Sequence, residues 1–346
     1  MVILAGALQW YQVLKKNVFK QQAIRQKLDI GSVALQFLRN DVQSSGYLGC
    51  RTLDDNWVIR SQFVDYVSPY RFLKTGQAVF GFYAVPGLCP RYLPARACTA
   101  LKEKSDVLVL YNVPKNIAVL KQAMTQRDDA IVVHTPGFQE KSLVLISDGV
   151  QGDLFVLSNE RKKPGEKIFH EAGSQSNNTN YLSKLYQKNA EVVELQMLAY
   201  YLGTPPRERL NPQAKTTYSL YRDDLVHAHG AEEIAVGITD FQVKYGVFDP
   251  VQGIVYRASN AIADEQWAFV RSVRINIEVD STSKKNSKTI WEYEFAIRNR
   301  NRRDFNSGVD IIDRPLAAGQ TSGGTSGLNH TDLGQPAGTT SQVGRR

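Results

Sequence analysis

The sequence has few cysteines and none of the short motifs that mark the common enzyme classes. Its three cysteines are Cys50, Cys89 and Cys98, and no two of them form the Cys-x-x-Cys pair that is typical of zinc sites. It has no Gly-Lys-Ser/Thr phosphate loop, no His-Glu-x-x-His and no Gly-x-Ser-x-Gly. These absences count against P-loop nucleotidases, zinc proteases and α/β-hydrolases. We therefore expect no catalytic residues, no cofactor and no metal.

Two pairs of polar residues have a spacing that could suit a metal site or a carboxylate dyad. His227 and His229 have the spacing that places two imidazoles on one face of a strand, where a metal could bind. The same segment also suits a polar turn, which is the interpretation that we adopt. The pair Asp128 and Asp129 is likewise interpreted as a turn and not as a carboxylate dyad.

The sequence also has no apolar run at its start that is long enough to span a bilayer. The run from Val2 to Leu8 is far shorter than the roughly 20 residues required, and it has neither the charged region nor the cleavage site of a secretory signal. Because Met1 opens directly into this run, we expect that an apolar helix has been cut midway and that its first part precedes Met1.

No proline occurs before Pro69, and apolar residues in this first segment recur at helical spacing. Leu4, Tyr11 and Val18 are seven apart, with Leu8 and Leu14 beside them, and Leu28, Leu35 and Val42 repeat the spacing, with Leu38 on the same side. This pattern predicts one long amphipathic helix from about residue 3 to residue 44. Gly31 is its weak point, and Ser45-Gly46 supplies a stop.

After Gly46 the pattern changes to turns and short strands. Strand-like runs begin at residues 106, 130, 143, 153, 191, 217, 231, 270 and 289. We predict an α+β fold, in which the long N-terminal helix packs on a mostly antiparallel sheet. The predicted divisions are the helix at 1–45, a globular β-rich domain at 46–313 and a disordered tail at 314–346, because the tail has almost no large apolar residue.

The charge and the cysteines leave several alternatives open. The net charge of +8 permits contact with nucleic acid, but only the arginines near Arg298 support it, and a solvated strand end explains them equally well. In an oxidising compartment Cys89 and Cys98 could close a short loop, or Cys50 could pair with either of them. We expect one disulfide, between Cys89 and Cys98, and one free thiol.

Several segments resemble, in the same order, those of the PilW-type minor pilins, which are related to the type II secretion pseudopilins. Residues 30–50 are similar to that family's helix end, which has the pattern aromatic-Leu-x-x-Asp-(Ile/Leu/Val)-x-x-x-Gly-Tyr-x-Gly-Cys. Further similar segments are Ser105 to Leu110, Leu143 to Asp148, Asp153 to Leu157, Ala199 to Leu202, Ser219 to Arg222, Ile234 to Gly246, Val270 to Ile275 and Ile297 to Arg300.

The resemblance implies a pilin-like fold and a subunit that is assembled through its N-terminal helix. Its partners would be other minor and major pilins and the pilus assembly platform, with contact to the inner membrane through the helix. The protein would then be placed in the inner membrane with a periplasmic domain, and on the pilus or cell surface once assembled. Under this interpretation Leu28, Leu35, Leu38 and Val42 pack on the subunit's own sheet, whereas the assembly residues contact neighbours: Leu4, Leu8, Tyr11, Leu14 and Val18.

The sequence departs from the family in two places. The family's prepilin-peptidase site, a Gly-Phe-Thr-Leu-Ile-Glu-like stretch, is absent, and we expect it to be encoded upstream of Met1. The family often carries a cysteine where this chain has Gly149, so that Cys89 or Cys98 could instead pair with Cys50. A type II secretion pseudopilin and a periplasmic or surface nucleic-acid-binding module are the alternative functions.

Overall fold

The computed structural model describes most of the chain between residues 2 and 298. The described residues are 2–47, 58–61, 77–89, 93–134, 137–158, 167–173, 177–205, 217–226, 230–279 and 289–298. Within the N-terminal helix, only part of the side chains is described. The tail predicted at 314–346 lies outside these ranges.

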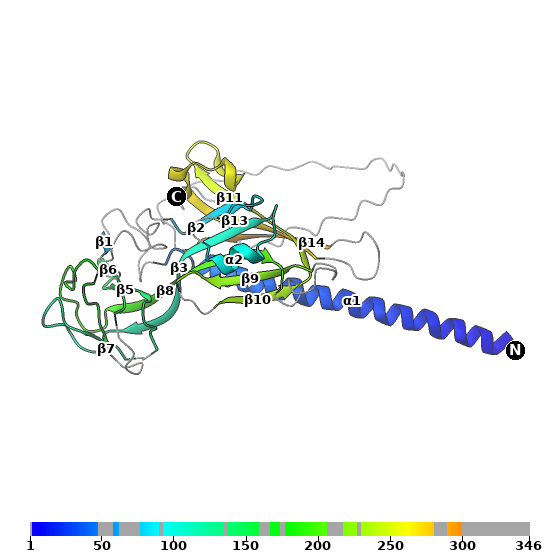
Figure 1. The fold of residues 1–346 in the computed structure, drawn as a ribbon, viewed down its shortest axis with the longest axis horizontal. Coiled ribbons are helices and arrows are strands. Elements are labelled where there is room, and N and C mark those ends of the chain that lie inside the picture. Colours follow the sequence, from blue (N-terminus) through cyan, green and yellow to red (C-terminus); the bar gives the residue numbers. More distant parts are fainter. Residues whose placement is uncertain are drawn as a thin grey trace, which may run out of the picture.

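Helix α1 (Val2–Ser44) has 43 residues, which corresponds to a length of about 65 Å at 1.5 Å per residue. Its last turns lie within the body of the molecule, and the rest projects away from it (Figure 1). The helix ends where the sequence predicts. Gly46 follows with φ +72°, a left-handed conformation that glycine adopts without the cost that a Cβ imposes.

Two long strands, β3 (Asp106–Val119) and β8 (Glu191–Gly203), form the spine of an eight-stranded sheet. β2 (Val79–Tyr83) pairs with β3. Along β8, the first half pairs with β5 (Leu143–Ser147) and the second half with β9 (Ser219–Asp224). β6 (Gln151–Val156) and β1 (Val58–Ser61) continue the sheet from β5, and β10 (Ala231–Val236) continues it from β9.

A second sheet of four strands has the order β12 (Gly253–Ala258), β11 (Ile238–Asp249), β13 (Val270–Val279) and β14 (Thr289–Ala296). β4 (Ile131–Val132) and β7 (Lys167–Ile168) form a small ribbon. The short helical segments are α2 (Ala95–Ala100), η2 (Ser259–Ala261) and η3 (Asp264–Phe269).

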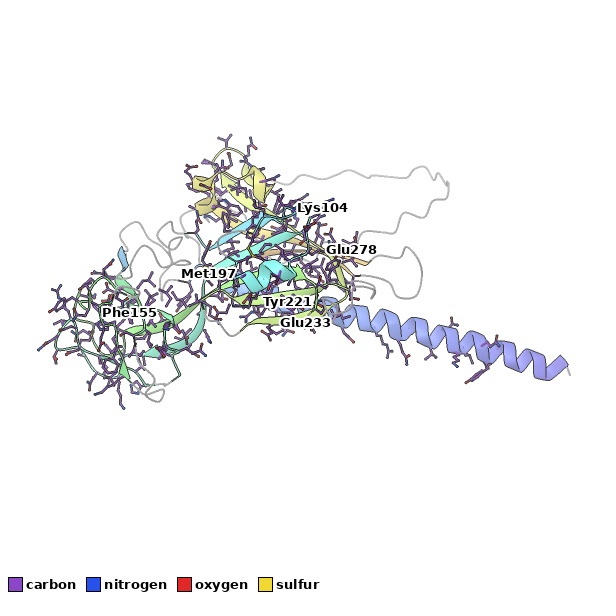
Figure 2. The ribbon with its side chains drawn as sticks, viewed as in Figure 1. Lys104, Phe155, Met197, Tyr221, Glu233 and Glu278 are labelled. Atoms are coloured by element: carbon purple, nitrogen blue, oxygen red, sulfur yellow. A yellow bond between two sulfur atoms is a disulfide. The ribbon has the colours of Figure 1, made fainter. Side chains whose placement is uncertain are left out.

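The main core lies where the two sheets meet the end of α1. Leu108 and Tyr200 of the large sheet, Ile275 and Phe295 of the small sheet, and Leu38 of the helix belong to one buried apolar cluster. A separate cluster fills the lobe around β5 and β6, where Phe155 is fully buried. Phe155 therefore lies far from Met197 and Tyr221, which are in the middle of the molecule (Figure 2).

The predicted α+β class is wrong, because the chain is mostly β. Its described part has fourteen strands in three sheets, not one sheet that a helix covers. Buried residues of both larger sheets join one core, to which α1 contributes only the side chains of its last turns. The sheets are antiparallel except where β1 pairs with β6 in parallel.

Candidate assembly helix and its anchorage

The projecting part of α1 carries large apolar side chains that are open to solvent. Trp10 is 71% exposed, Tyr11 62%, Leu14 44% and Val18 52%. At 3.6 residues per turn, these four positions fall within an arc of about 100° on one side of the helix. The side chains drawn on this part of α1 in Figure 2 have no other element beside them. The helix thus presents an apolar stripe, defined here as Trp10, Tyr11, Leu14 and Val18.

The last turns of α1 are buried instead. Ala34, Leu35, Leu38 and Val42 are 7% exposed or less and belong to the main core. Their spacing of three and four residues puts them on one face. Tyr11, Leu14 and Val18 are thus exposed, whereas Leu35, Leu38 and Val42 are buried. The side chains of Leu4, Leu8 and Leu28 lie outside the described part, and so does Cys50.

A charged residue of the helix is held by the large sheet. The Asp41 Oδ2 accepts a hydrogen bond from Arg222 Nε at 2.7 Å and another from the Tyr200 hydroxyl at 2.5 Å. Burial, together with the nearby Asp41 carboxylate, raises the pKa of Tyr200 well above its ordinary value. The phenol therefore stays protonated and can donate. This arrangement ties α1 to strands β8 and β9 with charge-assisted hydrogen bonds.

The backbone that follows α1 is closely packed and hydrogen-bonded to the large sheet. Gly46 N donates to the carbonyl oxygen of Tyr111 at 2.8 Å. A Cβ at Gly46 would lie 2.7 Å from the Cβ of Ala78. Tyr47 then donates from its hydroxyl to Glu191 on β8. Within three residues of the end of α1, the chain is thus hydrogen-bonded to β3 and β8.

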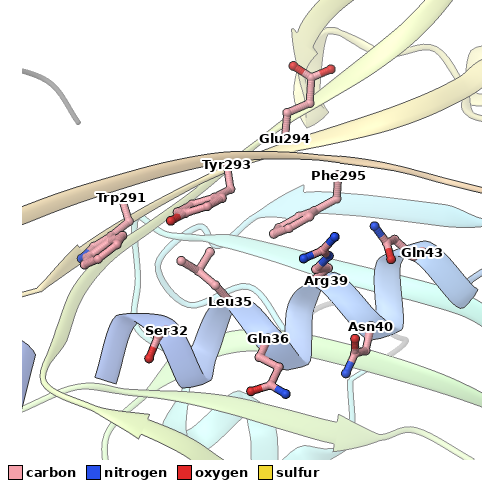
Figure 3. A pocket seen from close by; sticks show the side chains of 10 residues that line it. All are labelled: Ser32, Leu35, Gln36, Arg39, Asn40, Gln43, Trp291, Tyr293, Glu294 and Phe295. Atoms are coloured by element: carbon pink, nitrogen blue, oxygen red, sulfur yellow. The ribbon is translucent and has the colours of Figure 1, made fainter. Parts of the chain in front are cut away.

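The other side of the anchored helix faces β14. A Cβ at Gly31 would lie only 3.0 Å from the indole of Trp291, so glycine lets this ring approach the helix closely. Trp291, Tyr293 and Phe295 form a row along β14 in which successive ring centroids are 6.2 and 6.1 Å apart and successive planes differ by 17° and 9°. The row faces α1 (Figure 3).

A groove of about 590 Å³ lies between α1 and β14. The helix contributes its polar flank and β14 contributes the aromatic row. The lining residues are Ser32, Leu35, Gln36, Arg39, Asn40, Gln43, Trp291, Tyr293, Glu294 and Phe295. Glu294 points away from the helix (Figure 3) and bonds to Arg274 and Tyr256.

The remaining predicted residues lie elsewhere. Cys89 and Cys98 form a disulfide that joins the segment after β2 to α2. Asp129 closes a turn, because its Oδ2 accepts hydrogen bonds from the backbone N–H groups of Thr125 and Gln126 at 2.8 and 2.7 Å. His227 and His229 lie outside the described residues.

Two features of the anchorage were missed in the sequence. The pairing of Asp41 with Arg222 joins distant segments, and nothing in a local pattern signals it. The aromatic row, in contrast, is visible as Trp291, Tyr293 and Phe295 at alternate positions, which in a strand must share one face.

None of the described helices is long and apolar enough to cross a membrane.

Part of the chain matches a known protein family. Neither the curated proteins nor the solved structures include a match to the chain. The model of one protein family, PilW, described as Type IV Pilus-assembly protein W, matches residues 199–309. This segment runs from the end of β8 through β14, and over it the chain is similar to the PilW family of type IV pilus assembly proteins.

Proposed function

We propose that this chain is a minor pilin-like subunit and that the apolar stripe of α1 packs against the helices of other pilins. The observation that carries the proposal is the contrast within one helix. Leu38 and Val42 are fully buried, whereas Trp10 and Tyr11 are more than half exposed. Burying a large apolar side chain contributes about 1.5–3 kcal/mol, so the exposed stripe provides free energy for association.

The anchorage supports this role, because a helix that transmits binding must be fixed to its own domain. Asp41, Arg222 and Tyr200 hold the helix on the large sheet, and Gly46 fixes its exit. The projecting part can then reach neighbours at a defined angle. In this proposal the protein has no catalytic role and acts by protein–protein contact alone.

The Cys89–Cys98 disulfide favours an oxidising compartment such as the periplasm. We therefore propose a periplasmic domain held at the inner membrane before assembly and on the pilus afterwards. A type II secretion pseudopilin could use the same helix, but the family match is to a type IV pilus family, which favours the pilus.

Site-specific photo-cross-linking in piliated cells tests the proposal. A photoreactive phenylalanine analogue is placed at Leu14, within the stripe, or at Gln12, which lies on the opposite side of the helix about 160° away. We expect covalent adducts with a pilin, identified by mass spectrometry, from position 14 and few from position 12. Equal adducts from both positions, or adducts with no pilus subunit, would contradict packing through the stripe.

A further inference from the structure

β14 is the last strand of the four-stranded sheet. It lies over a part of α1 that the sheet does not fully cover. In the described part of the chain β14 is an edge strand that pairs with β13 and with no other strand. The groove of about 590 Å³ opens beside this edge, over the polar flank of the helix (Figure 3). An edge strand presents backbone N–H and C=O groups that can pair with a further strand.

The volume of the groove and the spacing of its aromatic side chains suit an added β-strand. Its volume is in the range of sites that hold several side chains. The aromatic row repeats every two residues along β14, so alternate side chains of an added neighbouring strand would lie beside successive rings. Aromatic and β-branched side chains form the favourable cross-strand pairs. On the helix side, Gln36 and Asn40 are exposed amides that can bond to hydroxyl groups.

We propose that an extended segment of another pilus subunit adds to β14 as a fifth strand. Its inward side chains, β-branched or hydroxylated, enter the groove beside Trp291, Tyr293 and Phe295. That the partner is a pilus subunit rests on the proposed function, whereas strand addition itself does not. The partner fits because one wall of the groove is α1, so that the contact continues the proposed assembly surface along the same helix. Recognition of this kind takes its affinity from backbone hydrogen bonds and its specificity from alternate side chains.

The first test uses the purified full chain and a labelled synthetic peptide of alternating threonine and valine with a lysine at each end. Fluorescence anisotropy measures its binding. We expect saturable binding that weakens at least about tenfold when the peptide is N-methylated at alternate residues, because that edge can no longer donate. Gln36→Trp fills the groove and should weaken binding similarly. Gln22→Trp, at an exposed position of α1 outside the groove, is the matched control and should bind as the wild type does.

Absence of peptide binding, or equal binding by the Gln36→Trp and Gln22→Trp variants, would overturn strand addition. Melting curves of both variants establish that they are folded. In cells, the photoreactive analogue at Gln36 should yield an adduct that peptide mapping assigns to an extended segment of another pilus subunit. An adduct within the same chain would instead show that the protein fills its own groove, and would overturn the proposed partner. Adducts from Leu14 without any from Gln36 would leave the proposed function standing and contradict this inference alone.

Discussion

Asp41 and Arg222 are 181 positions apart in the chain, and the Arg222 Nε donates to the Asp41 Oδ2 at 2.7 Å. This pair connects the anchored end of the N-terminal helix to β9 of the large sheet. Tyr200 on β8 donates to the same carboxylate oxygen. The Asp41 carboxylate therefore accepts hydrogen bonds from residues on two strands. Its removal would leave both donors without this acceptor.

We predict that Asp41→Ala lowers the free energy of unfolding by about 2–3 kcal/mol, since a charged and a neutral donor are left unsatisfied. Chemical denaturation of the purified chain measures this loss. In a double-mutant cycle with Arg222→Ala, the two losses should couple by about 1 kcal/mol or more. Asp29→Ala, an exposed position of the same helix, should change stability by less than about 0.5 kcal/mol. Additive losses at Asp41 and Arg222 would show that the pair contributes nothing as a pair.

The exit from the helix gives a prediction with an internal control. Gly46 and Gly87 both have φ +72°, but a Cβ at Gly46 would lie 2.7 Å from the Cβ of Ala78, whereas a Cβ at Gly87 would meet nothing within 4 Å. Gly87→Ala should cost about 1–2 kcal/mol through the left-handed backbone alone. Gly46→Ala should cost more, because the backbone must also shift. Thermal melts compare the two, and equal losses would mean that the contact with Ala78 is easily relieved.

The junction between the two sheets should respond to pH through Asp106. Its Oδ2 accepts a hydrogen bond from Val243 N of β11 at 2.7 Å. Burial, which outweighs this bond, raises the pKa of Asp106 from 3.8 to about 6, with a further increase from Asp240. The folded state therefore holds this proton more tightly than the unfolded state does. The resulting stability is fully present below about pH 3.8 and is lost as the pH rises through about 6.

The variant Asp106→Asn stays neutral and keeps an amide oxygen for Val243 N. We expect the stability of the wild type, measured relative to this variant by urea denaturation, to fall between about pH 4 and about pH 7.5. All other titratable groups are present in both proteins, so the comparison isolates Asp106. A stability difference that is constant with pH would show that Asp106 titrates normally.

Local patterns were sufficient for the helix and most strands. Ser45-Gly46 marked the helix end, and the alternation in Val270 to Val279 marked β13. Pro114 lies inside β3, although a proline argues against a central strand. β3 nevertheless continues to Val119, since register shifts on both sides of Pro114 let the ladder resume.

The arrangement of the sheets could not be predicted. Alternation says which side chains share a face, but it does not say which sheet that face meets. A sequence with one long helix and many strands therefore suggested a helix on a sheet, whereas the strands divide into sheets that pack together. For the candidate site, spacing separated Tyr11, Leu14 and Val18 from Leu35, Leu38 and Val42. The contact of Asp41 with Arg222 depends on the tertiary fold.

We propose that the end of α1 is part of the folded core of its own domain and that its projecting part packs against other pilins. The most direct measurement compares two paired variants for melting temperature and for surface pili. Leu14→Asp with Val18→Asp should leave the melting temperature within about 2 °C of the wild type and abolish pili, because the charges lie on the exposed stripe. Leu35→Asp with Leu38→Asp should unfold the chain, since a buried unpaired charge costs several kcal/mol. Two results would contradict separate roles for the two parts of α1. One is a stripe variant with a melting temperature as low as that of the core variant, and the other is a stripe variant with an unchanged number of surface pili.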